Sequence, residues 1–424
     1  MKKNKPEKRV IFTKKMKKEY KILIPDMLPI HFGMLCKYFN THGYDMELLT
    51  DQSQDVIATG LKYVHNDTCY PALLVVGQLM SALLSGKYDT HKTALMISQT
   101  GGGCRASNYI FLLRKALKKA KMEYVPVISF NVGGLEKNPG FKLGLKTGID
   151  LINIVLYGDL LMLLKNQCLV YEKNKGDTDA RVKKWDDILS KEIIEGKLSK
   201  EHLKENYRAI VKDFKKIKRV KDKKLKVGIV GEIYVKFSPL GNNHLEDFLY
   251  KEDVEVFLPG LYDFCLYCVQ NMIIDNELYK VAKFKTKIIR IVYNYLIKKQ
   301  NELIDAVKEI GGFRPPASFE HTKTLVDGYI GRGAKMGEGW LLTAEMLEII
   351  ESGIDNVICT QPFGCLPNHI VGKGMMKTIK ERNENANILA IDYDASASKI
   401  NQENRIKLML ASAKERLKEE KRSK

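Results

Sequence analysis

Short apolar runs alternate along this chain with longer segments in which apolar residues recur at helical spacing. Turn-forming residues bound most of the short runs. The runs with strand character are residues 20–25, 45–50, 93–98 and 123–130 in the first half of the chain, and 227–230, 254–260, 356–362 and 387–394 in the second. Such alternation is typical of α/β units built around parallel sheets.

The longer segments predict helices and divide the chain. In the stretch 108–122, Ile110, Leu113 and Leu117 share one helical face and lysines occupy the other. From Asn153 to about Lys221 the pattern is almost wholly helical, and a second series of strands follows it. No short repeat is apparent. The sequence therefore predicts a basic tail (1–19), an N-terminal α/β domain with a helical extension (20–220), a C-terminal α/β domain (221–412) and a charged tail (413–424).

Length and composition fit a globular protein with a large core, because 45% of the 424 residues are hydrophobic. The first apolar stretch, residues 10–12, is too short for a signal peptide. The longest one, residues 149–164, is interrupted by Asp150 and Asp159 and falls short of a membrane span. We expect a cytoplasmic protein with no membrane partner.

A formal net charge of +19 raises the question of a nucleic-acid or anionic partner. The excess is concentrated near the N-terminus and between Lys173 and Lys224. A run such as residues 212–224, "KDFKKIKRVKDKK", is more typical of a solvated helix face and linker than of a binding stripe. The charge distribution therefore does not favour nucleic acid as the partner.

Three of the eight cysteines share loops rich in glycine and proline. They are Cys69 in "NDTCYP", Cys104 in "TGGGCRASNY" and Cys365 in "QPFGCLPNH". Cys104 and Cys365 follow predicted strands, and ligands bind at the carboxyl ends of strands in open α/β sheets. Peptide N–H groups near glycines can donate to sulfur, as around iron–sulfur clusters. The alternative is that the three are small buried core residues.

The other cysteines point less clearly to a metal. The eight lack the dense spacing of a disulfide framework, so we expect reduced thiols. Cys265 and Cys268 form a CxxC pair within a predicted helix, without the second pair of a zinc site, and indicate helix packing. Cys36 and Cys168 lie in helical contexts and are expected in the core. Cys359 ends a predicted strand and is either a fourth ligand or a neighbour of Cys365.

Together with "GEGWLLTAEM" and "AIDYDASAS", these motifs resemble the cluster-binding module of the 2-hydroxyacyl-CoA dehydratase superfamily, in its activase-related branch. The resemblance runs from about Tyr20 to Leu410. It implies two Rossmann-like, doubly wound, mainly parallel domains with additional helices, and a 4Fe-4S cluster held by Cys69, Cys104 and Cys365. A related branch carries a double-cubane 8Fe-9S cluster.

The resemblance also implies a function and partners. An ATP-dependent activase with its own cluster supplies low-potential electrons for radical dehydration of a CoA ester (a lyase reaction) or for reduction of a small substrate, in an anaerobic host. The sequence has no GxxxxGK[ST] loop, so ATP hydrolysis is expected of the partner. A homodimer or a heterodimer with a related subunit is expected. The alternative is a cluster-free scaffold that binds an activase or a nucleic acid through its basic surface.

Two further groups of residues are candidates for contact with substrate. Arg105, Ser107 and Asn108 follow Cys104 and either reach its cavity or cap the next helix, and His369 lies four residues after Cys365. The second group immediately precedes a predicted helix, where a helix N-terminus either binds a phosphate-bearing substrate such as CoA or is a plain glycine-rich connection: Gly337, Glu338 and Gly339.

Overall fold

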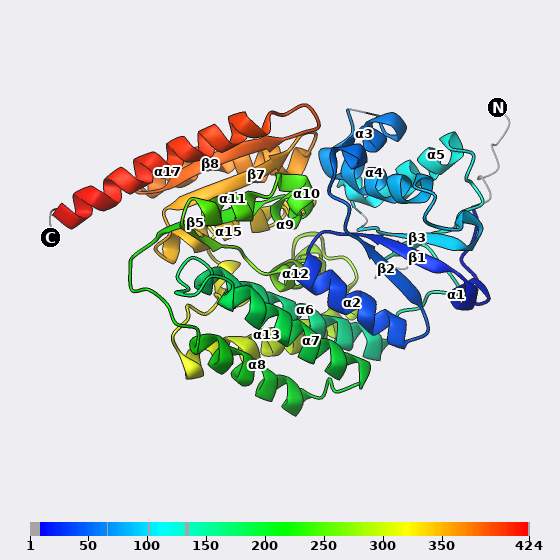
Figure 1. Ribbon diagram of the computed structural model, residues 1–424, viewed down its shortest axis with the longest axis horizontal. Helices are drawn as coiled ribbons and strands as arrows, with labels where there is room; N and C mark the ends of the chain where they lie inside the picture. The colour runs from blue at the N-terminus through cyan, green and yellow to red at the C-terminus, as the bar shows by residue number, and fades with distance from the viewer. Residues whose placement is uncertain (1–8, 66, 101, 132–134, 423–424) are drawn as a thin grey trace. The chain divides into compact units, whose positions relative to one another are not determined.

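The structure is a computed structural model in which residues 9–65, 67–100, 102–131 and 135–422 are described, with side chains through Glu419. The chain divides into two compact units, Met1–Gly148 and Ile149–Lys424. Each unit contains one four-stranded parallel sheet with flanking helices (Figure 1). The α/β class and the two Rossmann-like sheets predicted from the sequence are confirmed.

The sheet of the first unit has the strand order β2-β1-β3-β4, with every neighbouring pair parallel. Its strands are β1 (Lys21–Pro25), β2 (Asp45–Leu49), β3 (Thr93–Ser98) and β4 (Val127–Phe130). Its helices are α1 (Met16–Glu19), α2 (Pro29–Thr41), α3 (Gln54–Tyr63), α4 (Tyr70–Leu84), η1 (Thr90–Lys92), η2 (Arg105–Asn108) and α5 (Tyr109–Lys119). Parallel neighbours require crossover helices, which these segments supply.

The sheet of the second unit has the order β6-β5-β7-β8, again all parallel. Its strands are β5 (Leu225–Gly231), β6 (Val254–Phe257), β7 (Asn356–Pro362) and β8 (Asn387–Tyr393). Helices α6 (Leu145–Cys168), α7 (Asp177–Ile194) and α8 (Lys200–Lys215) precede β5. The remaining helices are α9 (Ile233–Phe237), α10 (Pro239–Asn242), α11 (Leu245–Lys251), α12 (Leu261–Tyr279), α13 (Lys283–Ile310), α14 (Phe319–Thr322), α15 (Trp340–Glu351), η3 (Asn368–Gly372), η4 (Lys373–Met375), α16 (Met376–Arg382) and α17 (Lys399–Arg422).

The two sheets repeat one topology. In each, the first strand is central, the second lies on one side of it, and the third and fourth lie on the other. The strand order therefore reverses beside the first strand, β1 or β5, and this switch point is where open α/β sheets bind ligands. The helix that leads into the third strand is α4 in the first unit and α15 in the second.

Close packing, of a helix on a sheet in one case and of two helices in the other, explains two glycines. A Cβ at Gly228 in β5 would lie 2.5 Å from Cγ2 of Ile349 in α15, and a Cβ at Gly77 in α4 would lie 2.3 Å from the carbonyl oxygen of Val56 in α3. All seven residues of β7 are buried, because both faces of a parallel sheet are covered. The sheets thus form the rigid scaffold that positions the candidate site residues.

The division of the chain differs from the sequence prediction, which placed residues 149–220 with the first domain. These helices pack on elements of the second unit. The Asp159 carboxylate in α6 accepts the N–H groups of Leu261 and Tyr262 at 2.9 Å each, and Arg208 in α8 pairs with Glu309 in α13 at 2.8 Å. A helical pattern shows that a segment needs a partner but not which partner, which is why the boundary was misplaced.

The two predicted tails are also shorter than expected. Residues 1–8 lie outside the described residues. Phe12 is buried and its carbonyl accepts the N–H of Gly140 at 2.9 Å, so this part of the chain belongs to the first unit. Residues 413–422 continue helix α17, where Ala413 is buried.

Among the described residues, α6 is the one helix that is long and apolar enough to cross a membrane. Of its most apolar 18-residue window, 61% is buried inside the protein. A side chain that is already packed cannot face lipid, and α6 carries Asp159 in its interior to cap α12. We therefore interpret α6 as a core helix.

Candidate functional site at the carboxyl ends of the sheets

Cys69 is the residue immediately before helix α4. It is the N-cap of that helix, is 5% exposed, and is followed by Pro71 in the first helical turn. Its Sγ lies 3.0 Å from the hydroxyl of Tyr109, and either atom can be the donor. The positive end of a helix dipole and a hydroxyl donor both stabilise a thiolate.

Cys104 holds the corresponding place before η2. Its half-buried Sγ accepts the N–H of Ala106 at 3.5 Å. The hydroxyl of Ser107 donates to the carbonyl oxygens of Cys104 at 2.5 Å and Gly102 at 3.1 Å, and the side-chain amide of Gln99 donates to the Ser107 carbonyl at 3.2 Å. Ser107 therefore fixes the cysteine loop, and Gln99 ties that loop to the end of β3.

The other two predicted neighbours of Cys104 stand on the outside of this turn. Arg105 lies in η2 and Asn108 is the residue before α5, and both are exposed. The capping role weighed for Asn108 is wrong, since its side chain makes no capping hydrogen bond.

Cys365 lies between β7 and η3 and is 7% exposed. Its carbonyl accepts the N–H of His369 at 3.2 Å, so a helical turn starts here too. Cys365 and Pro367 repeat the Cys-x-Pro spacing of Cys69 and Pro71. His369 contacts Cys365 through its backbone, while the residue itself is exposed.

Cys359 is placed differently from the other three. It lies in the middle of β7, is fully buried, and packs in the core with Val230 and Met346. A Cβ at Gly372 would come within 3.3 Å of its sulfur. Burial, reinforced by the carboxylates of Glu345 and Asp392, raises the pKa of this thiol to about 12. Of the two possibilities left open by the sequence, the structure supports the buried neighbour.

The remaining cysteines lie within helices. Cys36 and Cys168 are buried in α2 and α6, as expected. Cys265 and Cys268 lie in α12, where Cys265 is half-buried and Cys268 is exposed, so helix packing describes only the first of them.

The repeated topology relates two of the candidate ligands to each other. Cys104 follows β3 and Cys365 follows β7, the third strand of each sheet. The two loops are also similar in sequence. The first begins with Ser98-Gln99 and ends with Gly103-Cys104, and the second begins with Thr360-Gln361 and ends with Gly364-Cys365. This similarity between the two loops was missed in the sequence because the first loop is one residue longer. Cys69 precedes α4, and the equivalent position before α15 is Gly339.

Cys69 and Cys104 belong to the first unit and Cys365 to the second. Across the part of the chain that the structure describes, no three side chains of His, Cys, Asp or Glu form a group suited to a metal ion. The local surroundings of the three cysteines nevertheless fit thiolate ligation of iron. Each cysteine stands ahead of a helical turn, and the Tyr109 hydroxyl lies beside the sulfur of Cys69 and the Ala106 N–H beside that of Cys104.

Of the two alternatives for Gly337, Glu338 and Gly339, the hydrogen bonds of the structure favour the plain connection over the anion site. The N–H groups of Trp340, Leu341 and Leu342 at the start of α15 donate to carbonyls of Ala334, Glu338 and Gly339. The buried Glu338 carboxylate accepts the N–H of Ile233 at 2.9 Å and places a carboxylate beside this helix end. A phosphate is disfavoured here because these N–H donors already have partners and an acidic side chain lies close to the helix end.

Buried charges around α15 were not found from the sequence. Lys236 and Glu345 form an ion pair at 2.9 Å with both side chains less than 5% exposed. Glu348, one turn further along α15, accepts a hydrogen bond from Thr322 at 3.0 Å. The available signal was two carboxylates in the otherwise apolar run "WLLTAEMLEII", which the helical pattern alone assigns to a solvent-facing side.

Each sheet also ends its central strand with a carboxyl group of raised pKa. Asp26 follows β1 and is 3% exposed, and burial raises its pKa to about 6. Glu232 follows β5 and accepts the N–H of Val235 at 2.9 Å. Burial, together with the nearby carboxylate of Glu338, raises its pKa to about 8. Groups that titrate near neutral pH at a switch point are candidates for proton transfer.

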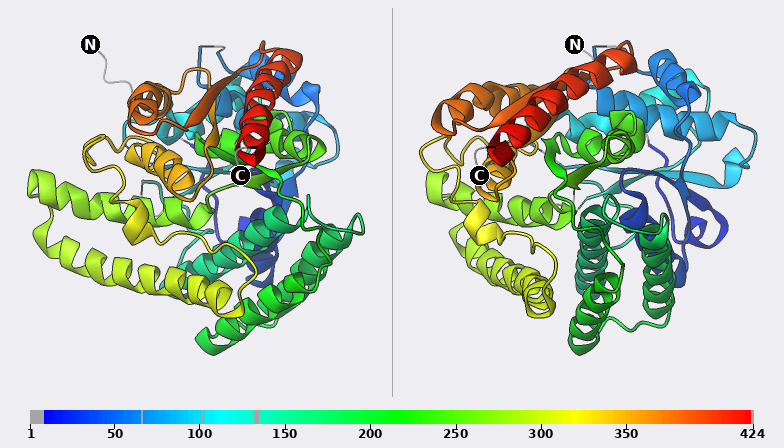
Figure 2. Two further views of the ribbon diagram at one scale, coloured as in Figure 1. Left: turned by 90° about the vertical axis from the view of Figure 1, so that its left-hand side faces the viewer. Right: turned by 60° about the vertical axis from the view of Figure 1, so that its left-hand side comes forward.

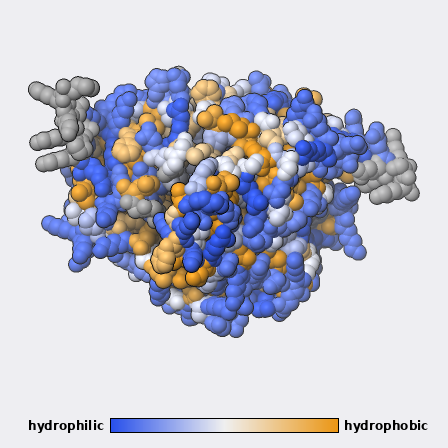
Figure 3. Space-filling model, turned by 180° about the vertical axis from the view of Figure 1, so that it is seen from behind, coloured by the Kyte–Doolittle hydropathy of each residue, from blue (hydrophilic) through white to orange (hydrophobic). Residues whose placement is uncertain are grey.

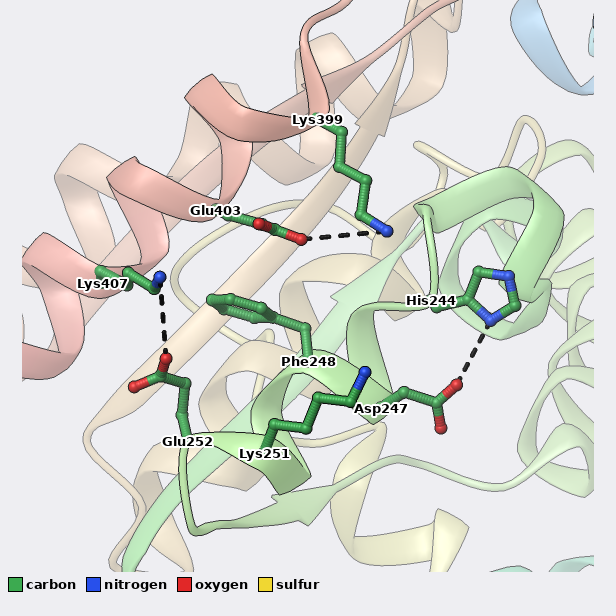
Figure 4. A pocket seen from close by; sticks show the side chains of 8 residues that line it. All are labelled: His244, Asp247, Phe248, Lys251, Glu252, Lys399, Glu403 and Lys407. Carbon is green, nitrogen blue, oxygen red and sulfur yellow. Dashed lines mark hydrogen bonds and ion pairs between the residues drawn. The ribbon is translucent and has the colours of Figure 1, made fainter. Parts of the chain in front are cut away.

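A surface pocket of about 530 Å³ lies between α11 and the start of α17 (Figure 4). Its charged side chains largely pair with one another: His244 with Asp247 at 3.2 Å, Lys399 with Glu403 at 3.9 Å and Lys407 with Glu252 at 3.9 Å. It contains none of the predicted site residues, and its paired charges select no particular ligand.

No protein-family model matches this sequence, and no curated protein matches it. The resemblance to the dehydratase superfamily therefore stays a prediction.

Proposed function

We propose that this chain is a cytoplasmic iron–sulfur protein of the 2-hydroxyacyl-CoA dehydratase type. Cys69, Cys104 and Cys365 hold a 4Fe-4S cluster or one half of a double-cubane 8Fe-9S cluster, and draw on both units of the chain. The observation that carries the proposal is their common setting, since each stands immediately before a helical turn and Cys104 and Cys365 occupy equivalent positions in the two sheets.

The residues around these cysteines have definite tasks in this proposal. The Ala106 N–H and the Tyr109 hydroxyl stabilise negative charge on sulfur, and Ser107 and Gln99 keep the Cys104 loop in place. When bound, a cluster with three thiolate ligands offers one open iron to a substrate oxygen or a small molecule. Asp26 and Glu232 are the carboxyl groups suited to take up or release the proton that accompanies the reaction.

Electrons come, in this proposal, from an ATP-dependent activase with its own cluster. The sequence contains no phosphate-binding GxxxxGK[ST] loop, which supports a separate ATPase partner. The substrate is a CoA ester that undergoes radical dehydration, or a small molecule that is reduced, in an anaerobic cell.

The decisive experiment is anaerobic iron and acid-labile sulfide analysis with the visible spectrum. It compares the wild type with Cys69→Ala, Cys104→Ala, Cys365→Ala and Cys359→Ala. Cys268→Ala is the matched control, because that thiol is exposed on α12. We expect about four irons per chain, or about eight for a double cubane, lost in the first three variants and retained in Cys359→Ala and in the control.

An iron-free wild type, purified and reconstituted without oxygen, would rule the proposal out. The net charge of +19 would then support the alternative function, a scaffold that binds an activase or a nucleic acid. Salt-sensitive binding to a duplex oligonucleotide distinguishes these two partners of the scaffold.

A further inference from the structure

Helix α13 exposes an apolar seam along its first half. Phe284, Ile288, Ile291 and Tyr295 are 80%, 53%, 70% and 38% exposed. Isolated apolar residues are common on protein surfaces, and hydrophobic side chains form separate patches among hydrophilic ones in Figure 3. The seam is distinguished by its spacing of four, three and four residues, which is the heptad spacing of a helix that packs against another helix.

The reverse face of α13 is fixed in the second unit. Thr286, Tyr293 and Leu296 are buried there, and the hydroxyl of Tyr262 donates to the Leu296 carbonyl at 2.9 Å. α12 and α13 lie side by side as a hairpin (Figure 2), and the Asn276 side chain donates to the Val281 carbonyl at 2.7 Å in its turn. The seam is therefore presented by a helix that is already folded and anchored.

Lysines flank the first heptad of the seam. At 100° per residue, Lys285 lies on one side of it and Lys287 on the other, at the e and g positions when Phe284 is d and Ile288 is a. Both are exposed, and among the described residues neither has a carboxylate partner. Arg290, further round the helix, is paired with Glu277 at 2.8 Å. The flanking positions of a heptad seam determine which partner helix is accepted.

We propose that this seam docks an amphipathic helix of another protein, with apolar residues in heptad spacing and carboxylates at its flanking positions. A second copy of this seam brings no carboxylate to these lysines, because the residues at its flanking positions are Lys285, Lys287, Val292 and Asn294. The heptad spacing favours a helix over a lipid surface as the occupant, and binding to lipid vesicles is one outcome of the test. The inference is independent of the proposed cluster.

The test uses the full-length protein and two synthetic helical peptides of about three heptads, both with Leu at a and d. One carries Glu at e and g and the other Lys, and binding is followed by fluorescence anisotropy. We expect the Glu peptide to bind and the Lys peptide not to bind. Ile291→Glu should weaken the binding of the Glu peptide by at least about tenfold. Ile400→Glu on α17, where the side chain is 69% exposed, should not.

A double reversal, Lys285→Glu with Lys287→Glu, should exchange the preference so that the Lys peptide now binds. Circular dichroism confirms that the variants remain folded. Equal binding of both peptides, or of neither, would overturn the proposal. Self-association that is measured by sedimentation and abolished by Ile291→Glu would also overturn it. So would binding to phosphatidylglycerol vesicles by a protein that binds neither peptide.

Discussion

At the residue scale, local context separated the three loop cysteines from the cysteines inside helices and strands, but it did not reveal buried charge. Glycine and proline beside Cys69, Cys104 and Cys365 predicted loops, and loops are where the structure places them. The surroundings of Cys359 became clear only from the structure, because the sequence pattern of a strand residue near a loop fits a ligand and a core residue equally well. The burial of Glu345 and Glu348 could not be predicted, since a helical pattern shows which face is buried only when the helix has one apolar and one polar face.

Glu348 should make stability depend on pH. Burial raises the pKa of its carboxyl from 4.5 to about 7. The protonated form is therefore favoured by folding, so its stabilising effect is complete below about pH 4.5 and is lost as the pH rises to about 7. Glu348→Gln keeps an acceptor for Thr322 and carries no charge. We expect this variant to match the wild type near pH 4.5 and to be more stable at pH 8 by on the order of 2 kcal/mol.

Urea denaturation at several pH values measures this difference, with Glu384→Gln on the exposed surface as the control that should follow the wild type throughout. A constant difference between Glu348→Gln and the wild type from pH 4.5 to 8 would show that the titration of this carboxyl does not contribute.

At the element scale, the positions of all eight strands in the described part of the chain could be predicted, because a strand in a parallel sheet is a short, nearly continuous apolar run between turns. Their ends were less certain: the expected strands 123–130 and 254–260 are confined to Val127–Phe130 and Val254–Phe257. The partner of each helix could not be read from the sequence, and α6 to α8 were therefore assigned to the wrong half.

The contact between α15 and β5 gives a prediction at this scale. A Cβ at Gly228 would lie 2.5 Å from Cγ2 of Ile349, so Gly228→Ala must push the helix away from the sheet. We expect a loss of about 1–3 kcal/mol in unfolding free energy, which is the usual range for overpacking. At Gly331 a Cβ meets no atom within 4 Å, so Gly331→Ala is the matched control. Equal stability of the two variants would contradict this packing.

At the scale of the whole molecule, the two-sheet architecture could be predicted, whereas its repetition could not. The echo between the loops of Cys104 and Cys365 is only a few residues long and contains a one-residue offset, so it becomes visible once the strand orders are known. The repetition also places a carboxyl group after each central strand, at Asp26 and Glu232.

The proposed cluster ligands Cys69, Cys104 and Cys365 come from both units of the chain, and the proposal therefore leads to a prediction about unfolding. A cluster bound only by the folded protein stabilises it, and one bound through Cys104 and Cys365 must break before either unit unfolds alone. Anaerobic differential scanning calorimetry should therefore show one transition at higher temperature for the iron-loaded protein than for the iron-free protein. Cys104→Ala and Cys365→Ala should each remove the whole increase, while Cys268→Ala retains it. An increase that survives in either ligand variant would mean that one unit binds its iron without the other.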